Sequence, residues 1–279
     1  MQTAINYINT ELKDLYPATE IKSFTYLIFE KLTGFSRTQI IVNKNTVFSS
    51  NQRYEIESII EKLKVFIPIQ YILGETEFYG HTFTVNESVL IPRPETEELV
   101  GWIHNENDTN ENLRILDIGT GSGCIAISLK HEFTNAKVDA FDISIKSLEI
   151  AKLNAKLNNL ELFFWKIDIL NAPDLSQKWD IIVSNPPYIP EMEKNEIHAN
   201  VINNEPHLAL FVPNNDPLVF YRHIALFAKK HLNSKGKLYF EIHRDAGQTC
   251  INILKELGFI EIELRKDISG NDRMIKASI

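Results

Sequence analysis

The first 70 residues carry apolar side chains at helical spacing. Ile5, Ile8 and Leu12 recur every three or four positions, which places them on one face of a helix. The same pattern predicts further helices over residues 20–32, 37–42 and 51–66. We therefore expect residues 1–70 to form a small helical bundle as an N-terminal domain. Its charges are nearly balanced and form no basic stripe, which leaves two roles open, a stabilising cap or a surface that grips a partner.

A different pattern follows the helical region. Aromatic and polar residues alternate over residues 78–85 around a glycine, which is typical of a β-hairpin. Pro92 and Pro94 then make a stiff connector, and Pro94 is well suited to start a helix. We place the domain boundary here, with residues 71–95 as hairpin and Pro-rich connector and residues 96–279 as a second domain.

From Leu113 onward, short apolar runs alternate with helical patterns. Strands are predicted over residues 113–118, 137–141, 162–165, 180–184, 237–242, 260–264 and 274–278. Helices are predicted over residues 125–131, 145–157, 217–232 and 246–257. Such alternation is typical of an α/β fold, in which a mostly parallel sheet is covered by helices on both faces.

Composition narrows the class of protein. With 44% apolar and 24% charged residues, the chain of 279 residues is ordinary for a soluble globular protein, and no apolar run approaches the ~18 residues of a membrane span. No signal peptide is visible, and the two distant cysteines suit a reducing cytoplasm. The eight histidines are scattered, so no metal site is predicted. A net charge of −8 disfavours a partner held through phosphates, so no direct nucleic-acid binding is expected.

A glycine-rich loop follows the first strand of the second domain. It reads Asp117-Ile118-Gly119-Thr120-Gly121-Ser122-Gly123 and leads into a helix. Glycines at a strand-to-helix turn let a ligand approach the backbone, because no Cβ intervenes. The spacing is G-x-G-x-G rather than the G-x-G-x-x-G of dinucleotide sites, so phosphate binding is not the obvious use.

Two acidic residues follow the next strands. Asp142 ends the second strand, where a carboxylate can accept both hydroxyl protons of a ribose. A helix N-cap role for Asp142 or Ser144 is an alternative, and both roles are compatible. Asp168 and Ile169 follow the third strand, where an acidic and an apolar side chain can meet an adenine or simply form a loop.

The fourth strand runs directly into Asn185-Pro186-Pro187-Tyr188. Neither proline can donate a hydrogen bond, so the strand ladder ends there. The result is a stiff corner at the carboxyl end of a strand, the edge at which open α/β sheets bind ligands. A Pro-rich exit loop with a surface tyrosine is the alternative to a functional site.

These motifs together resemble the class I S-adenosylmethionine-dependent methyltransferases. Within that class, the chain looks like the PrmC/HemK glutamine methyltransferases of peptide chain release factors. The resemblance extends over roughly residues 67–279 and includes the connector VLIPRPETEELV (89–100), the stretch 205–210 and the stretch 267–273. The sequence departs from the family pattern at Glu241-Ile242-His243-Arg244, where a glycine is expected after the Glu-Ile pair, and in lacking an aromatic residue after Asp168.

The resemblance implies a Rossmann-like fold with a seven-stranded, mostly parallel sheet, and a helical N-terminal domain that recognises the substrate. It implies S-adenosyl-L-methionine as cofactor and S-adenosyl-L-homocysteine as product, and no metal is expected beside them. The sequence does not show the oligomeric state, so a monomer is the default. The cofactor site would consist of Asp117, Gly119, Thr120, Gly121, Ser122, Gly123, Asp142, Asp168, Ile169 and Asn185. The catalytic and substrate-binding residues would be Asn185, Pro186, Pro187 and Tyr188, while the roles of Arg93, Glu95 and Thr96 are open.

The expected reaction is methyl transfer to the side-chain amide of a glutamine in a Gly-Gly-Gln loop of a release factor, which tunes translation termination. In this hypothesis the side-chain oxygen of Asn185 and the backbone oxygen of Pro186 accept the two N–H protons of that amide. Tyr188 packs against the planar amide. Two alternatives remain: a DNA adenine methyltransferase, which the acidic balance disfavours, and a non-catalytic module that only binds the cofactor.

Overall fold

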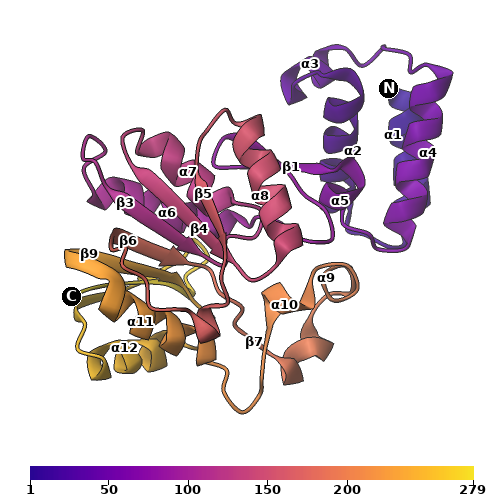
Figure 1. The fold of residues 1–279 in the computed structure, drawn as a ribbon. Coiled ribbons are helices and arrows are strands. Elements are labelled where there is room, and N and C mark those ends of the chain that lie inside the picture. The colour runs from indigo at the N-terminus through magenta and orange to yellow at the C-terminus, as the bar shows by residue number, and fades with distance from the viewer. The chain divides into compact units, whose positions relative to one another are not determined.

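The computed structural model describes all 279 residues and divides them into two units (Figure 1). The first unit comprises Met1–Gly74 together with Ala199–Asn204. The second comprises Glu75–His198 and Glu205–Ile279. The hairpin therefore belongs to the larger unit, and a short segment from the middle of the chain belongs to the helical unit, which no pattern in the sequence indicated.

The helical unit contains α1 (Gln2–Leu12), α2 (Ala18–Thr33), α3 (Arg37–Val42), α4 (Ser50–Lys64), α5 (Ile69–Leu73) and α9 (Ala199–Ile202). Its core is made by the apolar faces that the spacing predicted, with Ile8, Ile28 and Ile60 fully buried. The predicted helices over residues 20–32, 37–42 and 51–66 are all present within two residues at each end.

Local signals set the ends of these helices. Ser49 caps α4 by accepting a hydrogen bond from the backbone N–H of Gln52, while the Gln52 side chain accepts one from the backbone N–H of Ser49. Gly34 ends α2 in the left-handed conformation, with φ of 69°. Asn204 attaches the returning segment within this unit, because its side chain donates to the backbone oxygen of Phe66 at 3.0 Å.

The larger unit starts with a hairpin of β1 (Glu75–Phe78) and β2 (His81–Thr84). Tyr79 and Gly80 form its turn, both with positive φ, as a two-residue turn between twisted strands requires. Phe78 and Phe83 are fully buried in the same core as the sheet. The hairpin is therefore a packed part of this unit.

A seven-stranded sheet forms the centre of the larger unit and confirms the predicted fold class. Its strands are β3 (Arg114–Ile118), β4 (Lys137–Asp142), β5 (Phe163–Lys166), β6 (Trp179–Ser184), β9 (Leu232–Glu241), β10 (Ile260–Lys266) and β11 (Asp272–Ser278). The order is β10-β11-β9-β6-β3-β4-β5, in which β5, β4, β3, β6 and β9 run parallel and the pairs β9–β11 and β11–β10 are antiparallel. From β3 the chain adds β4 and β5 on one side of β3, and it then adds β6 and β9 on the other side. The strand order therefore reverses between β3 and β6.

Helices cover both faces of this sheet, as predicted. They are α6 (Pro94–Glu106), α7 (Cys124–Glu132), α8 (Ile145–Leu157), α11 (Val219–His231) and α12 (Gly247–Glu256). Successive residues of a strand point to opposite faces. Thus Ile115 packs in the core with α6 and α7, whereas Leu116 packs in the core with α11 and α12.

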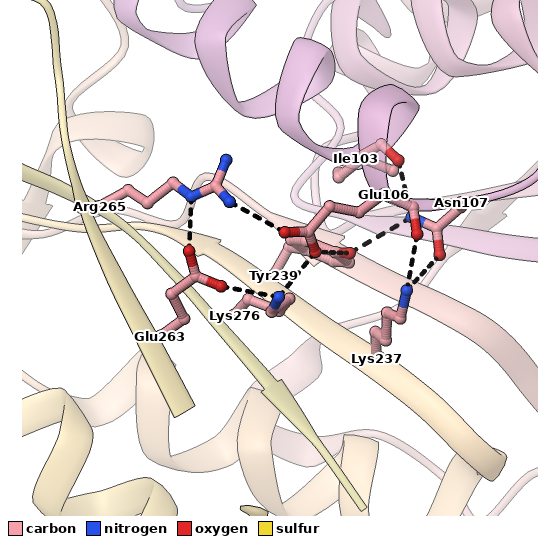
Figure 2. Close-up of polar contacts among 8 residues, drawn as sticks. All are labelled: Ile103, Glu106, Asn107, Lys237, Tyr239, Glu263, Arg265 and Lys276. Atoms are coloured by element: carbon pink, nitrogen blue, oxygen red, sulfur yellow. Dashed lines mark hydrogen bonds and ion pairs between the residues drawn. The ribbon is translucent and has the colours of Figure 1, made fainter. Parts of the chain in front are cut away.

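Polar contacts fix the C-terminal end of α6 to three strands of the sheet (Figure 2). The Glu106 carboxylate accepts hydrogen bonds from Lys276 at 2.7 Å and from Arg265 at 2.9 Å. Lys237 donates to the backbone oxygen of Glu106 and to the side chain of Asn107. These contacts attach the last turn of α6 to β9, β10 and β11.

Some element predictions were wrong in their bounds. The strand predicted from Lys237 begins at Leu232, and the helix predicted from Pro217 begins at Val219. Residues 189–212 contain β7 (Ile189–Pro190), a 3₁₀ turn at Glu191–Glu196, α9, α10 (His207–Leu210) and β8 (Phe211–Val212). Another 3₁₀ turn, at Ile169–Asn171, follows β5. These pieces are too short to show a period. None of the helices is both long and apolar enough to cross a membrane.

Candidate active site

A cavity of about 220 Å³ lies at the carboxyl ends of the parallel strands. Its walls come from the residues that follow β3, β4, β5 and β6, from the connector at Ser88–Leu90, and from Pro206, Leu208, Ala209, Phe220 and Ile224. This is the edge at which open α/β sheets bind ligands. A second cavity, of about 460 Å³, lies in the helical unit among residues such as Tyr7 and Phe48, and no predicted site residue lines it.

The glycine-rich loop contributes Gly119 and Gly121 to the cavity. Both have positive φ, 74° and 55°, and a Cβ added to either would meet no atom within 4 Å. Gly123 has a different reason to be glycine. A Cβ there would lie 3.0 Å from the Ile127 side chain and 3.2 Å from that of Ala151, so it lets α7 pack closely on α8.

The remaining predicted residues of the loop lie beside the cavity rather than on its wall. Asp117 is fully buried, and the Thr120 hydroxyl donates to its carboxylate at 2.6 Å. Burial raises the pKa of Asp117 to about 7. The backbone N–H of Thr120 also donates to the Phe141 oxygen at 3.0 Å. Asp117 and Thr120, together with buried Ser122, thus hold the loop in shape from behind.

Asp142 lines the cavity and is held by two backbone donors. The N–H of Gly121 lies 2.9 Å from one carboxylate oxygen, and the N–H of Ser144 lies 2.8 Å from the other. The N-cap of α8 is Ser144, whose hydroxyl accepts from the N–H of Ser147 at 3.2 Å. Burial raises the pKa of Asp142. Each carboxylate oxygen keeps a further lone pair, so Asp142 can still accept hydroxyl protons from a ligand.

Asp168 and Ile169 also line the cavity, together with Ile167 and Leu170. The Asp168 carboxylate accepts from the N–H of Leu170 at 3.0 Å and from the Asn171 side chain at 2.8 Å. Asp168 therefore stabilises its own turn, and the apolar side chains beside it form a surface suited to a flat ring.

Asn185, Pro186 and Pro187 stand on the cavity wall. The amide nitrogen of Asn185 donates to the Thr96 hydroxyl oxygen at 3.2 Å, which leaves its side-chain oxygen available as an acceptor. Tyr188 does not line the cavity. Its hydroxyl donates to Glu241 at 3.3 Å and its ring lies 5.8 Å from that of His243. Packing of Tyr188 against a substrate amide stays a prediction.

Two family models match the chain, the PrmC N-terminal domain over residues 3–74 and the methyltransferase small domain over residues 98–210. A release factor glutamine methyltransferase from Flavobacterium psychrophilum is 49% identical over 270 residues, covering 96% of this chain and 95% of the relative. One from Bacteroides thetaiotaomicron is 45% identical, covering 98% of each chain. The chain belongs to the release factor glutamine methyltransferase family. The resemblance drawn from the sequence is confirmed.

Solved structures support the fold of this family member. The crystal structure of a methyltransferase from Pyrococcus furiosus matches with a TM-score of 0.53 and 16% identity, covering 82% of this chain and 98% of that one. At such identity the match concerns the fold alone.

In this member of the family, the sequence left the roles of Thr96 and Arg93 open and assigned no role to Glu241 or Glu205. Thr96 and Glu241 are buried and bonded to each other at 2.6 Å, although 145 positions separate them. Arg93 pairs with Glu205, whose side chain is only 1% exposed. A signal for Glu241 existed, since it ends a strand that runs parallel to β6, at the edge where the cavity lies.

Proposed function

We propose that this chain transfers the methyl group of S-adenosyl-L-methionine to the side-chain amide nitrogen of a glutamine in peptide chain release factors. Membership of the release factor glutamine methyltransferase family supports this reaction. The observation that carries it is local: the acceptor-rich corner of Asn185 and Pro186 shares one cavity with the glycine loop and with Asp142. A donor of the methyl group and the group that receives it must meet in one place.

The residues of the cavity fit a nucleoside with a polar tail. Asp142 offers fixed carboxylate oxygens for ribose hydroxyls, and Ile167, Ile169 and Leu170 offer an apolar surface for the base. Gly119 and Gly121 leave room for close approach to the backbone. When bound, the cofactor would supply an electrophilic methyl group on a sulfonium.

The protein must make a poor nucleophile react. The lone pair of an amide nitrogen is delocalised into its carbonyl group. The Asn185 side-chain oxygen and the Pro186 backbone oxygen would accept the two N–H protons of the substrate amide, which orients the nitrogen and favours the positive charge that grows on it. In such a transfer the N–C bond would form as the C–S bond breaks, and the nitrogen would then lose one proton to solvent. Alignment of this kind can contribute about 7–11 kcal/mol.

Mass spectrometry of a purified release factor incubated with this protein and S-adenosyl-L-methionine tests the proposal. We expect one added methyl group on the glutamine of the Gly-Gly-Gln loop. A release factor with that Gln→Glu substitution serves as the control, because its carboxylate would place acceptors against acceptors. Discrimination of about 10⁴ or more is expected from such a site. An unmodified glutamine at full enzyme occupancy, or methylation of the glutamate variant, would contradict the proposal.

A further inference from the structure

Behind the asparagine corner lies a chain of hydrogen bonds that starts at a buried acid. One carboxylate oxygen of Glu241 accepts the Thr96 hydroxyl proton at 2.6 Å, and the other accepts that of Tyr188 at 3.3 Å. The Thr96 oxygen accepts in turn from the amide nitrogen of Asn185 at 3.2 Å. Glu241 and Thr96 are both 2% exposed and do not line the cavity.

The direction of this chain follows from counting protons. A carboxylate can only accept, and a hydroxyl has one proton to give. Once Thr96 gives its proton to Glu241, its oxygen can only accept from Asn185. The two ends of an amide have nearly the same shape, so hydrogen bonding alone decides which end faces which way. The NH₂ end of Asn185 is thereby held toward Thr96, and its oxygen is left for the substrate.

We propose that Glu241, acting through Thr96, is the positioning residue that sets the orientation of the Asn185 amide and so makes the corner an acceptor of N–H protons. The inference rests on the proposed function and deepens it. We call the chain of hydrogen bonds from Asn185 through Thr96 to Glu241 the relay. Without the relay, the Thr96 hydroxyl can turn and donate to the Asn185 oxygen. The NH₂ group would then face the cavity, where it would meet the N–H protons of a substrate glutamine.

The residues around the relay favour the ionised form of Glu241 and hold Thr96 in place. Burial raises the pKa of Glu241, while the hydrogen bond from Thr96 and the positive charge of Arg273 oppose that rise. Arg273 is itself held by Asp267 at 3.1 Å. Thr96 sits in the first turn of α6. Glu205 pairs with Arg93, the residue directly before α6. This ion pair restrains the start of the helix, and with it the position of the Thr96 hydroxyl.

Steady-state methylation of a release factor by a set of variants tests the relay. We expect Thr96→Val and Glu241→Gln each to lower kcat by about 10-fold or more, short of the about 10²–10³ of losing a direct contact. The KM for S-adenosyl-L-methionine should change by less than about threefold, because neither residue lines the cavity. Thr96→Ser keeps the hydroxyl and should retain kcat within about threefold. The double variant should lose no more than the worse single variant, because both residues act through one chain.

A matched control separates positioning from simple destabilisation. Glu106→Gln removes the charge of another acidic residue that anchors α6, at the opposite end of the helix from Thr96. This variant should leave kcat unchanged, even if the protein becomes less stable. If Glu106→Gln lowers kcat as much as Glu241→Gln does, or if Thr96→Ser is as impaired as Thr96→Val, the relay is overturned.

NMR of the Asn185 side-chain amide gives a readout that needs no substrate. In the wild-type protein the NH₂ proton that Asn185 donates to Thr96 should exchange slowly with solvent, and in Thr96→Val and Glu241→Gln it should exchange at least about 10-fold faster, as expected when a protecting hydrogen bond is lost. Fast exchange in the wild type would overturn the relay. Slow, Thr96-dependent exchange in a protein that fails to methylate any release factor would instead uphold the relay and reject the proposed function.

Discussion

At the scale of single residues, the proposed selectivity for an NH₂ group depends on which groups at the cavity can only accept hydrogen bonds. Asn185 presents an oxygen because its nitrogen is already engaged by Thr96. Pro186 has a backbone oxygen and no N–H. An asparagine followed by prolines is therefore a compact way to surround an NH₂ group with acceptors.

Asn185→Ala should nearly abolish turnover. The substitution removes one of the two groups that would orient the substrate nitrogen, so kcat should fall by about 10²–10³ or more. The affinity for S-adenosyl-L-methionine should fall much less, because Asp142, the glycine loop and the apolar wall remain. Single-turnover methylation and calorimetric titration of the cofactor would measure the two effects, and near-normal turnover would remove Asn185 from the mechanism.

Asp117 should make the stability of the protein depend on pH. Its pKa is raised by burial from 3.8 to about 7, so between these values the folded state holds a proton that the unfolded state has lost. Stability is therefore greatest below the unfolded value and falls as pH rises toward 7, by at most about 1.4 kcal/mol per pH unit. Asp142 and Glu241, whose pKa values are also raised, act in the same direction.

Urea unfolding of the wild type and of Asp117→Asn at pH 5, 6, 7 and 8 would measure this dependence. The variant, which cannot ionise there, should show a flatter profile. Identical profiles would mean that Asp117 is ionised in the folded protein throughout this range.

At this scale the sequence indicated residues that line the cavity but not what holds them. Asn185, Asp142 and the glycines could be found because each follows a recognisable strand. The partnership of Thr96 with Glu241 could not, since it joins an α6 residue to the end of a strand 145 positions later. The stretch around Glu241 stood out only as a departure from the family pattern.

At the scale of elements, the hairpin and the glycine loop are joined by one side chain of α8. Asn154 is fully buried. Its amide oxygen accepts from the N–H of Thr84 at 2.7 Å, and its nitrogen donates to the backbone oxygens of Thr84 and Ser122, both at 2.9 Å. The outward backbone groups of Thr84, at the end of β2, are thereby satisfied without a third strand.

Asn154→Ala should destabilise the protein and loosen the loop at once. The substitution leaves buried backbone groups of Thr84 and Ser122 without partners, which costs about 1–3 kcal/mol for each such group. Cofactor affinity should fall as well, because Ser122 belongs to the loop whose glycines line the cavity.

Urea unfolding and cofactor titration of Asn154→Ala would give both numbers. Asn158→Ala is a matched control at the C-terminal end of the same helix, because the Asn158 side chain donates to the hairpin oxygen of Thr82 and to the Asn154 oxygen and has no hydrogen bond to the glycine loop. Equal losses of cofactor affinity in the two variants would show that the link to the loop is unimportant.

Elements with a clear period were predictable, and the others were not. The central strands β3, β4 and β6 appeared as short apolar runs because both of their faces are buried. Residues 189–212 contain pieces of two to six residues with no period to detect, yet this region contributes Pro206, Leu208 and Ala209 to the cavity. Its structure depends on tertiary contacts such as the pairing of β7 with β8.

At the scale of the whole molecule, the chain separates its chemistry from its helical unit. Every residue that lines the cavity at the sheet edge belongs to the larger unit. The helical unit matches the PrmC N-terminal domain and keeps a nearly balanced charge. We therefore propose that the helical unit serves recognition of the release factor and not binding of the cofactor.

Hydrogen exchange with and without S-adenosyl-L-methionine tests this division. A ligand present at 100 times its Kd stabilises the state that binds it by about 2.7 kcal/mol. We expect this protection in the residues that build the cavity, near positions 88–90, 117–123, 142–147, 167–170, 184–187 and 205–209. Helices α1 to α4 contribute no residue to it, so their exchange rates should not change. Protection of those helices comparable to that of the cavity would mean that the cofactor orders the whole chain, and the helical unit could not then be assigned to the protein substrate alone.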